Sequence, residues 1–210
     1  ILFALGAGAF NLLAGYTGQL SMAHAAFLMI GTIVGAHIGV IWGQSFWLCL
    51  PIAAVAGAAL GVVFGMPALR LRGLYLMLAT IGVHFIVLLA WREYIVHWFG
   101  FGGVRFVTPT LPSWLHWIPG INPEDGEFLI NTQFRWFWVN LAITTLCLLF
   151  LVNVIRSREG RAFAAVRDRD ISATLLGINV PRTKLVAFAL SSAMVSVSGC
   201  LLSFYNRARS

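Results

Sequence analysis

Six apolar runs separated by more polar segments constrain the fold of this chain more than any other feature. A helix needs about 20 apolar residues to cross a bilayer, and backbone groups in lipid must find hydrogen-bond partners within the protein. We therefore expect an all-α fold, a polytopic bundle of about six transmembrane helices that forms one domain over residues 1–210. The predicted spans are residues 1–14, 23–42, 47–69, 74–91, 136–155 and 185–205.

The composition agrees with a membrane protein. Hydrophobic residues make up 60% of the chain and charged residues only 10%, whereas about a quarter of the residues in a soluble domain are charged. The chain begins at Ile1, inside an apolar run and without a methionine, and it stops shortly after the last run. We therefore expect the transmembrane domain to be truncated at both ends.

Positive charge is concentrated in one segment between predicted spans. Residues 156–184 contain seven of the fourteen lysines and arginines, and cytoplasmic loops carry the excess of these residues. This predicts that 156–184 is a cytoplasmic loop, that 92–135 is an external loop, and that Arg70 and Arg72 face the cytoplasm. Because the net charge of +7 follows from membrane orientation, we expect no nucleic-acid partner.

Two glycine series have the spacing of a helix-packing surface. Gly31, Gly35, Gly39 and Gly43 recur every four residues, as do Gly57, Gly61 and Gly65. Small residues at this spacing let helix backbones approach closely within a membrane. We interpret both series as packing surfaces, in preference to a moving, pore-lining interface.

The predicted spans contain no acidic residue, no P-loop and no metal-ligand pattern. All seven acidic residues fall in predicted loops or at span ends, which argues against a proton-coupled carrier, because a carboxylate within the membrane is costly and retained for function. The single lysine, Lys184, follows Thr183, so the Gly-Lys of a P-loop ATPase is missing. The histidines and cysteines show no metal-ligand spacing. We expect no catalytic residue, metal site or cofactor in this chain.

Two segments between apolar runs have a composition of their own. The first, GYTGQLSMAHAAF at residues 15–27, mixes glycines with polar side chains and predicts a helix break, which a membrane tolerates only against protein or a water-filled cavity. The second is 156–184, where alanine and leucine alternate with charge and predict one or two short amphipathic helices. Asp168 and Asp170 are expected to favour the start of the second short helix, and Gly177 to end it before Pro181.

The amphipathic pattern of 156–184 has two interpretations. One is a basic helix that lies on anionic lipid. The other is a docking element that fits a groove on a partner protein through small residues on one face. Those small residues are Ala162, Ala165 and Ala173.

Three stretches, taken in order, resemble a known family. They are GYTGQLSMAHAAF, LRLRGLYLMLAT at 69–80, and GRAFAAVRDRDISATLLGINVPRTKLVAFALSS at 160–192. Together they resemble permeases of the branched-chain amino acid (LIV-type) ABC importers, and most of all the half of the heterodimeric pore that carries GYTGQ-S-x-x-H-A-A-F. The resemblance covers nearly the whole chain, and the external loop 92–135 matches least.

The resemblance implies a permease subunit of an ATP-driven importer of branched-chain or hydrophobic amino acids in the bacterial cytoplasmic membrane. The implied partners are a homologous second permease subunit, two ATPase subunits that bind ATP and Mg²⁺, and a periplasmic substrate-binding protein. It also implies that 156–184 contains the coupling helix, which docks on the ATPase. The residues expected to couple are Asp170, Ala173, Leu176 and Gly177.

The helix break is the candidate substrate path under this resemblance, because helix ends at such a break can receive a substrate carboxylate. The candidate residues are Gly15, Gly18, Gln19, Ser21 and His24. The alternative is that these residues only hold the break in shape through hydrogen bonds between helices. Alternatives for the whole chain are an ABC permease for urea or short amides, a secondary carrier that works without an ATPase, and a non-transporting scaffold.

Overall fold

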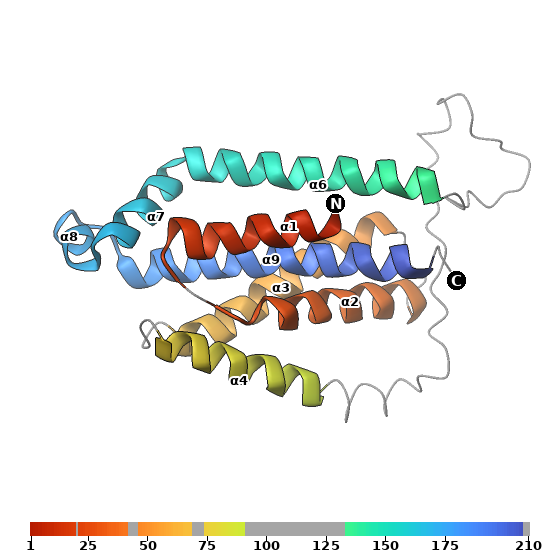
Figure 1. Cartoon of the computed structure of the whole chain (residues 1–210), viewed down its shortest axis with the longest axis horizontal. Coiled ribbons are helices and arrows are strands. Elements are labelled where there is room, and N and C mark those ends of the chain that lie inside the picture. Colours follow the sequence, from red (N-terminus) through yellow and green to blue (C-terminus); the bar gives the residue numbers. More distant parts are fainter. Residues whose placement is uncertain (20, 42–45, 69–73, 91–132, 208–210) are drawn as a thin grey trace, which may run out of the picture.

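The computed structural model describes residues 1–19, 21–41, 46–68, 74–90 and 133–207, which form helices and short connections without a strand in these ranges (Figure 1). The described helices are α1 (Leu2–Phe10), which continues directly as the π-helix η1 (Asn11–Tyr16), α2 (His24–Ile41), α3 (Phe46–Ala68), α4 (Leu74–Ala90), α6 (Gln133–Arg156), α7 (Arg158–Asp168), α8 (Asp170–Leu175) and α9 (Val180–Arg207). The prediction of an all-α helical bundle is confirmed.

Each predicted span corresponds to an apolar helix, but the helices differ in length. Within α3, α6 and α9, the segments Phe46–Pro67, Phe137–Arg156 and Val180–Phe204 are long and apolar enough to cross a membrane. The segments Leu2–Tyr16, His24–Ile38 and Tyr75–Ala90 are apolar but shorter. The predicted external loop 92–135 lies outside the described residues, except for residues 133–135, which already belong to α6.

The last helix starts earlier than predicted, at Val180 instead of residue 185. Pro181 is compatible with this start, because a helix does not use the backbone N–H groups of its first turn. The side chain of Asn179 completes the start, since its Oδ1 accepts a hydrogen bond from the N–H of Arg182 at 3.2 Å. Pro181 therefore lies inside the first turn of α9, where the sequence pattern suggested a connection.

Helix α9 is the centre of the bundle, with α1, α2 and α3 packed along it (Figure 1). Of the apolar segment of α9, 67% is buried, compared with 28% for α3 and 17% for α6. Aromatic rings pack edge to face between α9 and its neighbours. The ring centroids of Phe27 and Phe188 are 5.8 Å apart, and those of Phe46 and Phe204 are 5.1 Å apart. Helices α4 and α6 lie at the outside and keep broad exposed apolar faces.

Both glycine series pack against α9, which confirms the packing interpretation for the described glycines. A β-carbon added at Gly31 would lie closer than 3.0 Å to backbone atoms of Ser196, and one added at Gly61 would overlap the side chain of Ser192. Gly35, Gly57 and Gly65 are similarly close to α9. Gly43 lies outside the described residues, and no packing is described for Gly39. Small residues thus meet small residues, and α2 and α3 both approach the α9 backbone closely.

The same contacts give the directions of the helices. Gly57, Gly61 and Gly65 meet successively earlier residues of α9, so α3 runs antiparallel to α9 and ends at the end of the bundle where α9 starts. Figure 1 shows α7, α8, the end of α3 and the start of α4 at this one end. The predicted orientation requires the end of α3 and the start of α4 to lie on the same side as residues 156–184, and they do. Arg70 and Arg72 themselves lie outside the described residues. The cytoplasmic location of that side stays a prediction.

Candidate functional site

The signature stretch contains the predicted helix break. Helical structure ends at Tyr16 and resumes at His24, and the residues between them have no regular structure where they are described. Gly18 has φ +68°, a left-handed conformation that costs little only for glycine. The chain therefore leaves η1 through Gly18 and enters α2 along an irregular path.

The break lies inside the bundle, away from its two ends. His24, the first residue of α2, contacts Ser191 with 2.8 Å between Nε2 and Oγ. Ser191 follows the start of α9 by 11 residues, which is about 16 Å at 1.5 Å per residue. Since the apolar core of a bilayer is about 30 Å thick, α2 begins roughly halfway along the bundle. The irregular segment occupies the half next to α7, as Figure 1 also shows.

Polar groups at the break are hydrogen bonded to α4 and α9, and through Ser191 of α9 they are connected to α1. The N–H of Met22 donates to Thr80 Oγ1 of α4 at 2.9 Å. Ser191 Oγ of α9, which contacts His24, also donates to the carbonyl oxygen of Ala9 in α1 at 2.9 Å. Within the break, the N–H of Ala23 donates to Ser21 Oγ at 3.3 Å. These contacts hold the irregular backbone in place, as the alternative interpretation of the polar residues requires.

Gln19 differs from the other candidate path residues. Its side chain is only 8% exposed, and its Nε2 has no hydrogen-bond partner in the described part of the chain. An unpaired buried amide costs about 1–3 kcal/mol. Gln19 is therefore the candidate with an unused donor, whereas Ser21 and His24 already use their polar atoms within the chain.

Gly15 and Gly18 contact Arg167 of α7. The Nη1 of Arg167 donates to the carbonyl oxygen of Gly15. A β-carbon at Gly18 would lie 3.5 Å from Arg167 Cγ, so Gly18 faces the stem of the same side chain. The structure thus brings the two glycines of GYTG to the segment between α6 and α9, residues 157–179, which we call the α6–α9 segment.

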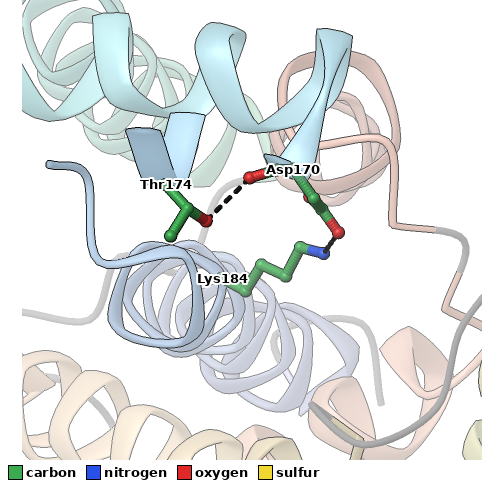
Figure 2. A network of polar contacts seen from close by, with 3 residues as sticks. All are labelled: Asp170, Thr174 and Lys184. Carbon is green, nitrogen blue, oxygen red and sulfur yellow. Dashed lines mark hydrogen bonds and ion pairs between the residues drawn. The ribbon is translucent and has the colours of Figure 1, made fainter. Parts of the chain in front are cut away.

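The α6–α9 segment contains two short helices, α7 and α8, as predicted. Asp170 lies in the first turn of α8, and Asp168 is the last residue of α7. The Oδ2 of Asp170 forms an ion pair with Lys184 Nζ of α9 at 2.7 Å, and Thr174 Oγ1 donates to the backbone oxygen of Asp170 at 2.9 Å (Figure 2). The ion pair fastens α8 to the start of α9. Asp170 thus points towards its own chain.

Gly177 ends α8 as predicted. It has φ +78°, its N–H donates to the carbonyl oxygen of Thr174 at 3.0 Å, and the next N–H, of Ile178, donates to the carbonyl oxygen of Ala173 at 3.0 Å. This is the usual arrangement at a helix end with a left-handed glycine. Gly177 therefore acts on the backbone, and no atom lies within 4 Å of an added β-carbon there.

The exposed face of α8 is not the small-residue face suggested by the sequence. Ala173 is 1% exposed and packs within the chain, whereas Ile171, Leu175 and Leu176 are 78%, 83% and 77% exposed. We call these three residues the α8 aliphatic cluster. Of the four predicted coupling residues, only Leu176 belongs to it. The i, i+4 spacing of Ile171 and Leu175 was a usable signal, but the sequence does not say which face of so short a helix packs inward.

Three further residues of the site were missed by sequence reasoning: Thr80, Arg167 and Ser191. Thr80 and Ser191 are hydroxyl residues inside apolar runs, and a buried hydroxyl in a membrane helix forms a hydrogen bond with another group. That pattern could have marked them as candidates, although it does not identify their partners. Arg167 is one of several arginines in its segment, so nothing in the sequence distinguished it.

Comparison with known proteins finds a matching family and several relatives. Residues 1–210 match the family described as branched-chain amino acid transport system / permease component. The chain is 31% identical over 215 residues to the high-affinity branched-chain amino acid transport system permease protein LivM of Escherichia coli (strain K12), which covers 96% of this chain and 49% of that protein. The corresponding LivM of Salmonella typhimurium is 30% identical with the same coverage. The LivH protein of Escherichia coli (strain K12), from a system of the same description, is 27% identical, over 95% of this chain and 66% of that protein.

The chain therefore spans about half the length of the LivM proteins that it matches. No solved structure matches it. The matched family, together with the apolar helices, identifies a multi-pass membrane protein.

Proposed function

The chain belongs to the permease family of branched-chain amino acid transport systems, and from this premise we propose that it forms half of the pore of an ATP-driven importer. Its substrates are branched-chain or other apolar amino acids. A homologous permease subunit forms the other half, and two ATPase subunits supply the energy. A substrate-binding protein delivers the amino acid from the periplasm, and the complex lies in the bacterial cytoplasmic membrane.

The observation that carries the proposal is the α8 aliphatic cluster. Three large aliphatic side chains are more than three-quarters exposed on a short helix at one end of the bundle. The helix itself is fastened to α9 by the ion pair between Asp170 and Lys184. A helix that packs one face against its own chain, through the buried Ala173, and exposes an apolar face is suited to docking in a groove of another protein. We assign this groove to the ATPase subunit, which makes residues 156–184 cytoplasmic.

The roles of the four expected coupling residues follow from their positions. Leu176 makes contact with the ATPase, together with Ile171 and Leu175. Asp170, Ala173 and Gly177 keep α8 in place: Asp170 through its ion pair, Ala173 through packing, and Gly177 through its left-handed backbone.

The substrate path runs along the helix break in this proposal, and Gln19 is the residue that contacts the amino acid. Its buried amide has no partner in the described chain, so a substrate carboxylate or carbonyl would satisfy it. Ser21 and His24 hold the break in shape through their hydrogen bonds. An uncharged surrounding suits an apolar side chain, since the described spans carry no acidic residue.

Reconstitution tests the proposal. The full-length permease pair, the ATPase subunits and the binding protein are placed in proteoliposomes, and uptake of leucine, urea and a polar amino acid is measured with and without ATP. We expect leucine uptake that requires both ATP and the ATPase subunits. Uptake that persists without the ATPase subunits would indicate a secondary carrier, and ATP-dependent uptake of urea in place of leucine would indicate a different substrate class.

A further inference from the structure

We propose that Arg167 is a positioning residue that joins the α6–α9 segment to the helix break, so that a displacement of α8 reaches the break through α7. The inference rests on the proposed function, because it requires an ATPase seated on α8. It assigns Gly15 and Gly18 to this connection and removes them from the substrate path.

Arg167 contacts both glycines of the break with different parts of its side chain. The guanidinium group donates to the carbonyl oxygen of Gly15. The stem lies over Gly18, where an added β-carbon would be 3.5 Å from Cγ and 4.0 Å from both Cα and Cβ of Arg167. The sequence separation between Arg167 and Gly15 is 152 residues. The GYTG turn thus contacts one arginine from a distant segment of the chain.

The end of η1 depends on partners of this kind, because the last carbonyl groups of a helix have no partner within the helix. The carbonyl oxygen of Leu13 accepts hydrogen bonds from Thr17 Oγ1 at 2.6 Å and from the N–H of Gln19 at 3.1 Å. The carbonyl oxygen of Gly15 accepts from Arg167. A positive charge is also favourable at the C-terminal end of a helix. Arg167 of α7 therefore supplies a hydrogen-bond donor and a positive charge to the end of η1.

On the side away from the break, α7, which carries Arg167, is connected directly to α8. Phe163 and Val166 of α7 are buried. A single residue, Arg169, separates α7 from α8, and its backbone joins both helices. Its N–H donates to the carbonyl oxygen of Ala165 at 3.3 Å, and its carbonyl oxygen accepts from the N–H of Ala173 at 3.0 Å. A force on the α8 aliphatic cluster therefore acts on the end of α7 that carries Arg167.

Beyond the break, the contact continues into the bundle. The N–H of Met22 is bonded to Thr80 of α4, and His24 is bonded to Ser191 of α9. Contacts at its two ends thus connect the break to α7 on one side and to α4 and α9 on the other. Such a connection transmits a conformational change only if the element has two arrangements whose balance both ends affect. The break, with its irregular backbone, is that element in our proposal.

The test compares Arg167→Ala with Arg161→Ala in the complete transporter. Arg161 is an exposed arginine on the same helix and serves as the matched control. Leucine uptake and ATP hydrolysis are measured on the same proteoliposomes, and the result is expressed as leucine transported per ATP hydrolysed. A merely structural cap would change stability and the amount of complex but not this ratio.

We expect Arg167→Ala to assemble and hydrolyse ATP while the ratio falls about tenfold or more, the size of effect that follows from losing a charge-assisted hydrogen bond. Arg161→Ala should retain the ratio of the unaltered protein. An unchanged ratio in Arg167→Ala would overturn the proposal. Should that variant not assemble, Arg167→Gln, which keeps an amide donor on a shorter stem, decides in the same way.

A second measurement follows the break directly. With the three native cysteines replaced by alanine, Met22→Cys, an exposed position of the break, is labelled with and without ATP. We expect ATP to change the labelling rate, and Arg167→Ala to abolish that change while a Ser172→Cys reporter, an exposed position of α8 outside the α8 aliphatic cluster, still responds to ATP. If the Met22→Cys response survives in Arg167→Ala, the connection does not run through Arg167. An unaltered complex that shows no ATP-dependent uptake would instead refute the proposed function, so the two failures are distinguishable.

Discussion

Removing the α8 aliphatic cluster should weaken ATPase binding without destabilising the permease. The perturbation is the double substitution Leu175→Ala and Leu176→Ala. Both side chains are more than three-quarters exposed, so they contribute little to the packing of the free chain. Nearly all of their surface is available for burial in a partner.

The magnitude follows from the atoms removed. Each substitution deletes three carbon atoms, and burying one CH₂ group is favourable by about 0.8 kcal/mol. Full burial of both leucines in the ATPase groove would therefore contribute about 5 kcal/mol, and half burial about 2.4 kcal/mol. Because 1.4 kcal/mol corresponds to a factor of ten, we expect the dissociation constant to rise roughly 50-fold or more.

The assay measures binding of ATPase subunits to the permease pair in lipid nanodiscs. The matched control is Leu146→Ala with Leu149→Ala, which removes the same atoms from exposed positions on the membrane-spanning part of α6. The control should bind the ATPase normally, and both variants should keep the melting temperature of the unaltered pair. An unchanged dissociation constant for Leu175→Ala with Leu176→Ala would refute the assignment of the cluster, as would an equal loss in the control.

Four further predictions follow from the packing and the break. Gly31→Ala should lower the melting temperature of the purified permease by several degrees, since overpacking costs about 1–3 kcal/mol. Gly82→Ala should not lower it, because nothing lies within 4 Å of a β-carbon there, and equal melting temperatures of the two variants would contradict the packing assignment. Gln19→Leu should raise the KM for leucine uptake about tenfold, because it removes the amide that contacts the substrate. It should not lower the melting temperature, because that buried amide has no partner in the described part of the chain, and an unchanged KM would exclude substrate contact. Asp170→Asn should weaken ATPase binding only slightly, because a partly exposed ion pair contributes about 1 kcal/mol or less, and a loss as large as that of the double leucine variant would place Asp170 in the interface. A cysteine at position 165 should react with a membrane-impermeant reagent only from the cytoplasmic side, and labelling from outside would overturn the orientation.

The membrane fold followed from short-range features of the sequence. An apolar run long enough to span a bilayer is stable in lipid as a helix, because the backbone must satisfy its own hydrogen bonds there. The glycine series likewise predicted close packing, and Gly177 predicted a helix end, since each depends on a property of glycine itself. The boundaries were less accurate where a residue is compatible with two structures. Pro181 is an example, because it fits both a connection and the first turn of α9.

The site could be predicted only in part. The GYTG stretch indicated a break by its own composition, and the described residues between Tyr16 and His24 are irregular, whereas the substrate contact of Gln19 stays a prediction. The partners of the break were not predictable, because Thr80, Arg167 and Ser191 come from three distant segments. The face that α8 exposes was also not predictable, since it depends on contacts with other segments: Ala173 is buried, and Asp170 pairs with Lys184 of α9.

The sequence by itself determined which segments are helical, where the chain breaks, and which family it resembles, because these depend on local hydrogen bonding, glycine geometry and ordered motifs. Only the tertiary structure decided that α9 is the central helix, that Arg167 closes the break, and that large aliphatic side chains, not small ones, face outward on α8. The physical reason is that these features depend on contacts between residues far apart in the chain. Gly15 and Arg167 are 152 positions apart, and the sequence between them contains no pattern that relates one to the other.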